Sequence, residues 1–145
     1  MIIKIVEKDD EVYNIQDLMD DLKKSRSVDE CGAIFSFEGF VRGKEDDMDV
    51  SKLILTVADK EKAEQEIKDI VESVKIKYGV VEINVVHYIG EFYTGDSLFL
   101  ISVLGNHRQE TLDAIKEAIE RVKFEIEFKK EEISNKGNKI IMAGG

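Results

Sequence analysis

The sequence predicts an α+β fold in one domain that spans all 145 residues. Two long segments carry apolar residues at three- and four-residue spacing, which places them on one face of a helix. Between and after these segments lie short β-branched and apolar runs separated by glycine-containing turns, the pattern of paired strands. Hairpins mixed with about three helices favour α+β over a regularly alternating parallel sheet. A chain of this length buries one core and is short for two domains.

The N-terminal part predicts two strands around a short helix. Residues 2–6 form an apolar run interrupted by charge, which indicates a strand. Residues 15–22 have apolar side chains at helical spacing, and Asn14 before them is a suitable N-cap. Residues 31–41 are rich in aromatic residues and predict a second strand. The acidic run at 43–47 is expected to be a mobile loop.

The middle of the chain predicts a strand, a long helix and a hairpin. Residues 52–57 form the strand, and residues 59–77 form the helix, which ends at Gly79. The expected buried face of this helix consists of Ala63, Ile67, Ile70, Val71 and Val74. Residues 80–89 and 98–104 are apolar runs separated by turn residues, so they are expected to pair as a hairpin.

The C-terminal part predicts a third helix followed by two strands. The helix begins near Arg108. Its expected buried face consists of Leu112, Ile115, Ile119 and Val122. Residues 124–132 alternate between apolar and charged side chains and predict a strand directly after the helix. Residues 139–142 form the last expected strand, after a turn at 134–138.

Composition excludes several classes of protein. The formal charge of −10 repels a nucleic-acid backbone, and all the excess acid lies in residues 1–104, because residues 105–145 hold 8 basic and 8 acidic side chains. The apolar runs are far shorter than the roughly 20 residues of a membrane-spanning helix. The N-terminus lacks the features of a secretory signal. We therefore expect a cytoplasmic protein with no nucleic-acid partner and no membrane contact.

Motifs of common cofactor and metal enzymes are also missing. The chain contains no Walker loop, GxGxxG, GxSxG or HExxH sequence. Cys31 is the only cysteine, which excludes an internal disulfide, and two histidines give no metal-ligand spacing. We expect neither a bound metal nor a resident cofactor.

Lys130 and Lys123 are candidate catalytic residues. In an extended strand, Lys130 lies on the same face as Phe124, Ile126 and Phe128, so it is a cation in phase with apolar side chains. A buried lysine has a lowered pKa, which suits proton transfer near neutral pH. The alternative is that the strand ends near Phe128 and Lys130 reaches water. Lys123, at the end of the third helix, is by itself better explained as a solvated residue that complements the helix dipole.

Three further positions could bind an anion or line a site. His107 and Arg108 lie between an apolar strand and a helix start, where backbone N–H groups and cations often meet an anion; the alternative is a simple helix cap. Arg42 ends the aromatic strand and could bind phosphate or pair with a nearby carboxylate. His87 alternates with apolar residues and is expected to be a core histidine.

Three stretches, in this order and spacing, resemble the large subunit of molybdopterin synthase. They are Gly32-Ala33 through Phe37 with Gly39 and Val41-Arg42; His87-Tyr88-Ile89-Gly90-Glu91 with Gly95-Asp96; and His107-Arg108 with Lys123 and Phe128-Lys129-Lys130-Glu131. The resemblance covers residues 30–132. It implies an α/β-hammerhead fold with mixed or antiparallel sheets. It also implies a homodimer that binds a small ubiquitin-like sulfur-carrier subunit on each copy, as a heterotetramer.

The resemblance further implies a sulfurtransferase. Its substrate is cyclic pyranopterin monophosphate, and its sulfur comes from a thiocarboxylate on the small subunit's Gly-Gly tail. The family's two active-site lysines correspond to Lys123 and Lys130, and its anion-binding positions to Arg42, His107 and Arg108. The resemblance favours an active-site role for Lys130 over the solvated alternative.

The chain departs from the family pattern in three places. Residues 55–59 lack the expected tyrosines, Lys129 stands where a tryptophan is usual, and an arginine expected near the C-terminus is missing, with only Lys136 and Lys139 nearby. These departures concern pterin stacking, partner docking and phosphate affinity.

Two alternatives to the enzyme remain at this point: an anion-sensing homodimer without chemistry, and a scaffold subunit in cofactor assembly. The chain also ends in Gly144-Gly145, like the tail of the small subunit. This is either a coincidence or a segment that occupies the sulfur-donor pocket.

Overall fold

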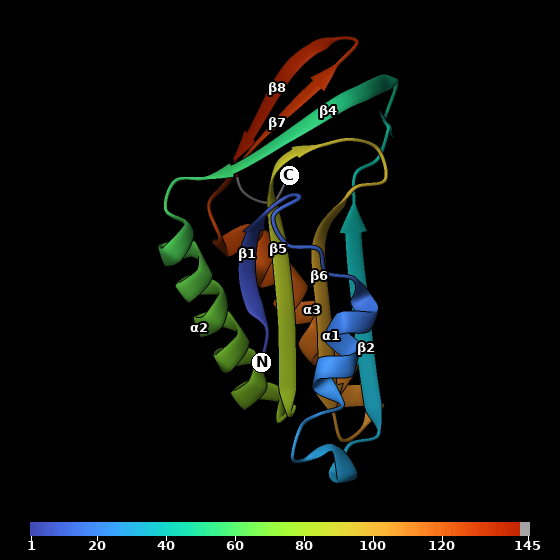
Figure 1. Cartoon of the computed structure of the whole chain (residues 1–145), viewed down its shortest axis with the longest axis vertical. Helices are drawn as coiled ribbons and strands as arrows, with labels where there is room; N and C mark the ends of the chain where they lie inside the picture. Colours follow the sequence, from blue (N-terminus) through green and yellow to red (C-terminus); the bar gives the residue numbers. More distant parts are fainter. Residues whose placement is uncertain (143–145) are drawn as a thin grey trace.

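A computed structural model describes residues 1–142, so the hypothesis for Gly144-Gly145 lies outside the described residues. Figure 1 shows the arrangement of the elements. The strands are β1 (Ile3–Glu7), β2 (Ala33–Phe40), β3 (Lys44–Glu45), β4 (Met48–Val57), β5 (Glu82–Phe92), β6 (Ser97–Gly105), β7 (Phe128–Ser134) and β8 (Gly137–Met142). The helices are α1 (Ile15–Leu22), α2 (Lys60–Tyr78) and α3 (Arg108–Glu125), with a short 3-10 turn at Val28–Glu30.

β5 joins two groups of strands. Its first part pairs with β6 on one side and, in parallel, with β1 on the other, and β2 continues the sheet beyond β6. Its end, from Gly90 to Phe92, pairs instead with β4, which leads to β7 and β8. We call β2, β6, β5 and β1 the body sheet, and β3, β4, β7 and β8 the arm. In Figure 1 the arm crosses above the body sheet. The sheet is mixed, as the resemblance implies.

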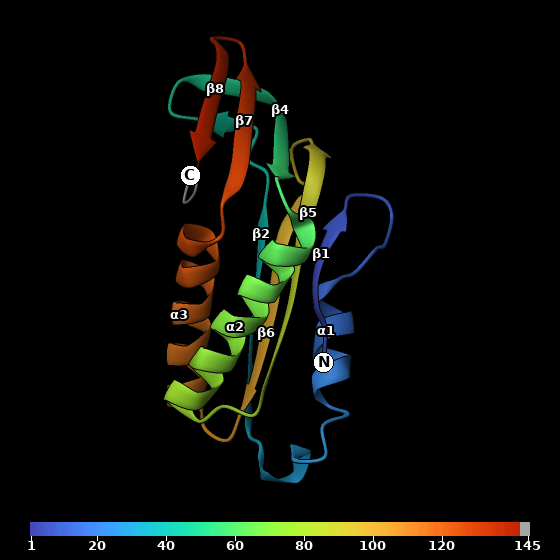
Figure 2. The same ribbon diagram turned by 90° about the vertical axis from the view of Figure 1, so that its left-hand side faces the viewer.

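The helices cover both faces of the body sheet. Figure 2 shows α2 and α3 side by side on one face and α1 on the other. The buried residues of α2 are the five that its spacing predicts. Asp59 caps the N-terminus of α2, accepting a hydrogen bond from the Lys62 N–H (3.1 Å), and Gly79 ends it in the left-handed region at φ 69°. None of the described helices combines the length and apolar character needed to cross a membrane.

Two local predictions are wrong. The acidic run at 43–47 is not a loop, because β3 pairs with the start of β4 across a tight turn. Asp46 adopts φ 53° there, a conformation that aspartate tolerates better than most residues, and Lys136 forms an ion pair with Asp47. The α3 helix extends to Glu125, so residues 124 and 125 are not in a strand. An ion pair of Arg121 with Glu125 at 2.6 Å holds this last turn.

The buried face of α3 is shifted from the predicted one. Ile115 and Val122 are buried as predicted and Ile119 is half-buried, but Leu112 is exposed. Thr111, Ala114 and Ala118 complete the buried face instead. The Thr111 hydroxyl donates a hydrogen bond to the His107 carbonyl (2.6 Å), so its burial leaves no polar group unsatisfied. The small alanines on this face permit close packing. A prediction based on hydrophobicity favours leucine over alanine at buried positions.

Candidate active site

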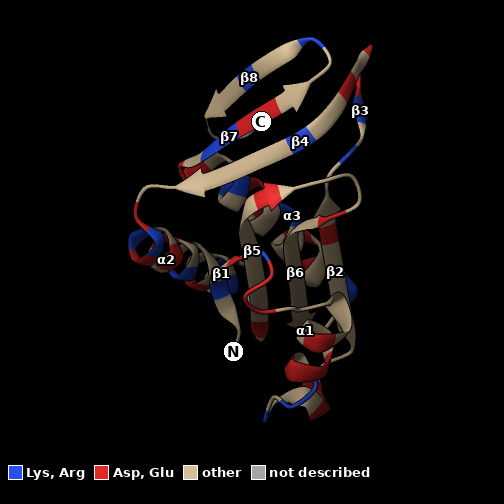
Figure 3. Ribbon diagram, turned by 45° about the horizontal axis from the view of Figure 1, so that its top comes forward, with Lys and Arg blue, Asp and Glu red and all other residues tan. Residues whose placement is uncertain are grey.

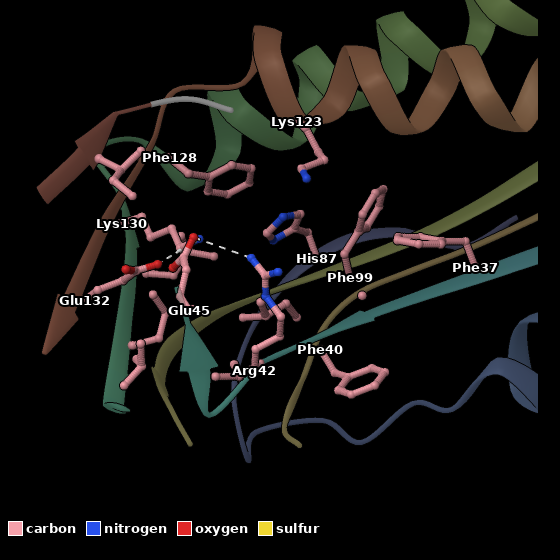
Figure 4. A pocket seen from close by; sticks show the side chains of 17 residues that line it. Phe37, Phe40, Arg42, Glu45, His87, Phe99, Lys123, Phe128, Lys130 and Glu132 are labelled. Carbon is pink, nitrogen blue, oxygen red and sulfur yellow. Dashed lines mark hydrogen bonds and ion pairs between the residues drawn. The ribbon is translucent and has the colours of Figure 1, made fainter. Parts of the chain in front are cut away.

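A cavity of about 330 Å³ opens where the arm meets the body sheet and the end of α3. Its size is within the range of small-molecule sites. The walls are mainly apolar and aromatic, and the polar lining residues are Arg42, Glu45, His87, Lys123, Lys130 and Glu132. Figure 4 shows these side chains converging from three directions.

β7 contributes Lys130 and Glu132 to the cavity. They stand two residues apart on an extended strand, so both face the same side as Phe128. The Lys130 ammonium lies 3.4 Å from Glu132 Oε1, and only 23% of the lysine side chain is exposed. Glu132 is buried, and its Oε2 has no hydrogen-bond partner within residues 1–142. The strand phase predicted from the sequence is therefore correct for Phe128 and Lys130.

Lys123 enters the cavity from the last turn of α3 (Figure 4). It forms no ion pair with any residue that the structure describes. An ammonium without a carboxylate partner, beside an apolar wall, is available to an anionic ligand. Lys123 and Lys130 therefore belong to one site, although they come from a helix and a strand.

Arg42 lies at the rim of the same cavity. Its guanidinium is 3.4 Å from Glu45 Oε1, and 74% of its side chain is exposed. β3 and its turn bring Glu45 to this position, so the hairpin that replaces the expected loop supplies the counterion. An ion pair this exposed contributes little to stability, about 0–1 kcal/mol. Arg42 can exchange its partner for a phosphate at low cost.

His87 lies in the middle of an aromatic stack. Its ring packs between Phe99, at a centroid distance of 5.3 Å, and Phe128, at 4.1 Å, and Phe37 meets Phe99 edge-on at 6.1 Å. Burial lowers the pKa of His87 from its ordinary 6.5 to about 4. The expectation of a core histidine is correct as to burial, but His87 also lines the cavity.

His107 and Arg108 do not lie at this cavity. They begin α3, whereas Lys123 is near its end, and fifteen residues at 1.5 Å each separate Arg108 from Lys123 by about 22 Å. His107 is 82% exposed, and its Nδ1 is 3.5 Å from Glu110. One chain therefore brings together Arg42, Lys123 and Lys130 and leaves the other two candidates at the far end of a helix.

Sequence reasoning missed Glu45, Glu132 and the aromatic wall. Glu132 follows Lys130 by two residues, so the same alternation that selects the lysine also selects this carboxylate. No comparable signal identifies Glu45, because its position depends on a turn that the sequence does not reveal.

The charges of the cavity favour an anion. Three cations meet two carboxylates there, whereas the acidic residues of α1 lie at the opposite end of the molecule (Figure 3). In residues 1–142, no group of three or more His, Cys, Asp or Glu side chains is arranged to hold a metal ion. The site is suited to binding an anionic small molecule and to moving protons through its lysines.

Comparison with known proteins gives a consistent result. A family model described as "MoaE protein" matches residues 9–125. The chain is 32% identical to a molybdopterin synthase catalytic subunit of Thermoplasma volcanium, over 94% of this chain and 93% of the relative.

Solved structures share the fold. A molybdopterin synthase from Staphylococcus aureus superposes with a TM-score of 0.82 at 25% identity, over 96% of each chain. A chain from a protein–protein complex of subunits 1 and 2 of the molybdopterin-converting factor of Helicobacter pylori has a TM-score of 0.70 at 24% identity. The match covers 97% of this chain and 88% of the Helicobacter pylori chain. At that identity it shows the fold alone.

Proposed function

The chain belongs to the MoaE family and has the function of a molybdopterin synthase catalytic subunit. From this we propose that it transfers sulfur from the thiocarboxylated tail of a small ubiquitin-like subunit to cyclic pyranopterin monophosphate, at the cavity lined by Lys123 and Lys130. The single observation that supports this site best is the convergence of both lysines with Arg42 in one aromatic-walled cavity.

The proposed sulfur transfer requires cations that are shielded from water. A thiocarboxylate is an anion, and an ammonium group holds and orients it more strongly where apolar walls exclude water. As the thiocarboxylate sulfur bonds to a carbon of the pterin side chain, the carbon–oxygen bond at that carbon breaks and the departing oxygen needs a proton. Lysine ammonium groups beside the reacting atoms can provide this proton. Water then cleaves the acyl C–S bond, which leaves the sulfur on the pterin and a carboxylate on the donor tail. Lys123, which has no carboxylate partner among the described residues, is the more available of the two to the donor tail.

The family resemblance implies that Arg42, His107 and Arg108 bind the phosphate, but about 22 Å of helix separates Arg108 from Lys123. One chain cannot place all of them around one substrate. We therefore propose a homodimer in which His107 and Arg108 of one copy complete the cavity of the other. In such a dimer, Arg108 of one copy lies near Lys123 of the other, although the two residues are far apart within one chain.

The small subunit is proposed to dock beside the arm. β8 is an edge strand whose outer side has no partner strand among the described residues, and Ile140 and Met142 on it are exposed. An edge strand can be extended by a strand of another protein. Ile141 of the same strand lines the cavity, so a partner bound there lies close to the lysines. The complex named for the Helicobacter pylori protein supports such a partner.

The test is sulfur transfer with purified components. The chain, a thiocarboxylated small subunit and cyclic pyranopterin monophosphate are mixed, and molybdopterin is assayed by fluorescence after oxidation. Lys123→Ala should lower turnover by about 100-fold or more, because a positioned proton donor contributes about that much. Lys116→Ala, an exposed lysine on the same helix and outside the cavity, is the control and should stay within about twofold of wild type.

The same assay separates the alternatives. An anion sensor would bind the substrate but form no product, and a scaffold would tolerate the loss of Lys123 and Lys130. Equal turnover by Lys123→Ala and Lys116→Ala would exclude the proposed site.

A further inference from the structure

The ring of His87 can meet a ligand only through one edge. Phe99 covers one face and Phe128 the other, with interplanar angles of 27° and 17°. Nδ1 lies 3.0 Å from the Tyr88 carbonyl oxygen, and because a carbonyl only accepts, Nδ1 carries the proton. The remaining nitrogen, Nε2, then has a free lone pair. Since His87 lines the cavity, the edge that holds Nε2 is the part of the ring the cavity can reach.

Nε2 is an acceptor that no neighbour uses. Nothing in residues 1–142 donates a hydrogen bond to it, and it is not among the sealed polar atoms that lack partners, which are one oxygen each of Glu110 and Glu132. In Figure 4 the ring lies between Phe128 and Phe99, below the end of Lys123. Nε2 is therefore open to a ligand rather than enclosed in the core.

Among the described residues that line the cavity, none of the other polar ones is a neutral acceptor. Arg42, Lys123 and Lys130 only donate hydrogen bonds. The two carboxylates are charged, and each is paired with a cation through one oxygen, Glu45 with Arg42 and Glu132 with Lys130, both at 3.4 Å. The second oxygen of Glu132 is sealed. A reduced pterin carries N–H groups on its rings and needs acceptors for them. His87 is the neutral acceptor in this set.

We propose that His87 is a substrate-binding residue whose Nε2 accepts a hydrogen bond from an N–H or O–H group of the bound pterin. The inference rests on the proposed function and deepens it. Burial suits this role, because the lowered pKa keeps the imidazole neutral, and an acceptor, throughout the neutral pH range. The aromatic stack holds the ring in one orientation, so the acceptor is fixed before the substrate arrives.

Two substitutions distinguish this role from simple packing. His87→Phe keeps a ring between Phe99 and Phe128 but removes the acceptor. His87→Gln loses the ring, but its amide oxygen can reach the position of Nε2. If His87 accepts a hydrogen bond from the substrate, Phe should raise KM for cyclic pyranopterin monophosphate about tenfold or more, and Gln should stay within about threefold of wild type. A packing role predicts the opposite order.

Tyr88→Phe is the matched control on the same strand. Tyr88 points to the other side of β5, where its hydroxyl accepts a hydrogen bond from the Tyr13 N–H (2.8 Å). Its loss should leave KM unchanged. If His87→Phe does not fold, His87→Leu replaces it, since leucine also lacks an acceptor and is close to glutamine in length.

Both turnover and direct calorimetric binding of cyclic pyranopterin monophosphate are measured. An unchanged KM and Kd in His87→Phe, a better result with Phe than with Gln, or a fall in kcat at constant KM would each overturn the proposal; the last would mean that His87 acts through Lys123. If wild type forms no product although it binds the small subunit, the proposed function fails, while the binding data still test His87.

Discussion

At the residue scale, His87 should make stability depend on pH. Its pKa is about 4 in the folded chain and about 6.5 when unfolded, so between these values the unfolded chain binds a proton that the folded chain does not. The stability is complete above pH 6.5 and is lost as the pH falls towards 4. At pH 5 the loss amounts to about 2 kcal/mol, at about 1.4 kcal/mol per pH unit.

Urea unfolding at pH 7.5 and pH 5 checks this expectation. His87→Phe has no titrating group at this position, so its unfolding free energy should fall by about 2 kcal/mol less than that of wild type between the two pH values. The carboxylates titrate in both proteins and cancel in the comparison. Parallel losses in the two proteins would show that His87 is protonated at little cost.

Residue patterns predict on which face of a strand a side chain lies. They predict less well which other residues that side chain contacts. Alternation along residues 124–132 correctly puts Lys130 in phase with Phe128. Alternation along residues 80–89 likewise buries His87, yet alternation cannot distinguish a core position from the wall of a cavity, because that depends on Phe99 and Phe128 from two other strands. The family resemblance, and not the spacing, selected the two lysines together.

At the element scale, the two hairpins of the arm are tied at their tips. The Asp49 N–H donates to Asn135 Oδ1, and the Asn135 N–H donates to the Asp49 carbonyl, both at 3.1 Å. Asn135→Ala removes the first bond and should lower the unfolding free energy by about 1 kcal/mol. Asn138→Ala, on the same hairpin, loses only an exposed bond to Glu131 at 3.3 Å and should cost a few tenths of that.

Chemical denaturation of both variants measures these changes in unfolding free energy. An equal change in the two midpoints would mean that the link between the hairpins contributes nothing. A larger loss in Asn138→Ala would reverse the assignment.

Elements with strong local signals were predictable, and those that depend on distant partners were not. The predicted limits of α1 and α2 are correct to within a residue, because Asn14, Asp59 and Gly79 mark their ends. β3 was missed, since it exists through pairing with β4 and an ion pair from Lys136, which is distant in the sequence. The end of α3 was placed too early, because residues 124–132 alternate like a strand.

At the scale of the whole molecule, the proposed dimer predicts complementation between inactive variants. Lys123→Ala and Arg108→Ala should each be inactive alone. When they are co-expressed, a mixed dimer holds one cavity with both residues intact. Random pairing should then restore about a quarter of the wild-type activity.

Lys123→Ala with Arg42→Ala is the matched control. Both residues line the same cavity of one chain, so a mixed dimer has no intact site and should stay inactive. Equal recovery in the two mixtures, or none in either, would contradict the shared site.

The α+β class was predictable from the residues, whereas the resemblance alone implied a mixed or antiparallel sheet. The separation of His107 and Arg108 from Lys123 follows from the length of α3, and the predicted limits of this helix already imply it.

Because β5 runs through both groups of strands, the cavity lies between the body sheet and the arm. These two parts differ in how readily they open locally. Strand pairing joins the arm to the body sheet at three residue pairs, between Leu53–Leu55 and Gly90–Phe92. Regions with few shared contacts open locally while the rest of a protein stays folded. Arg42, Lys130 and Glu132 lie on the arm or at its junction, whereas His87 lies on the body sheet and Lys123 on α3, which packs against that sheet. A ligand that bridges the two parts would therefore suppress the brief opening of the arm, and its binding would slow amide hydrogen exchange in β7 and β8 far more than in β6.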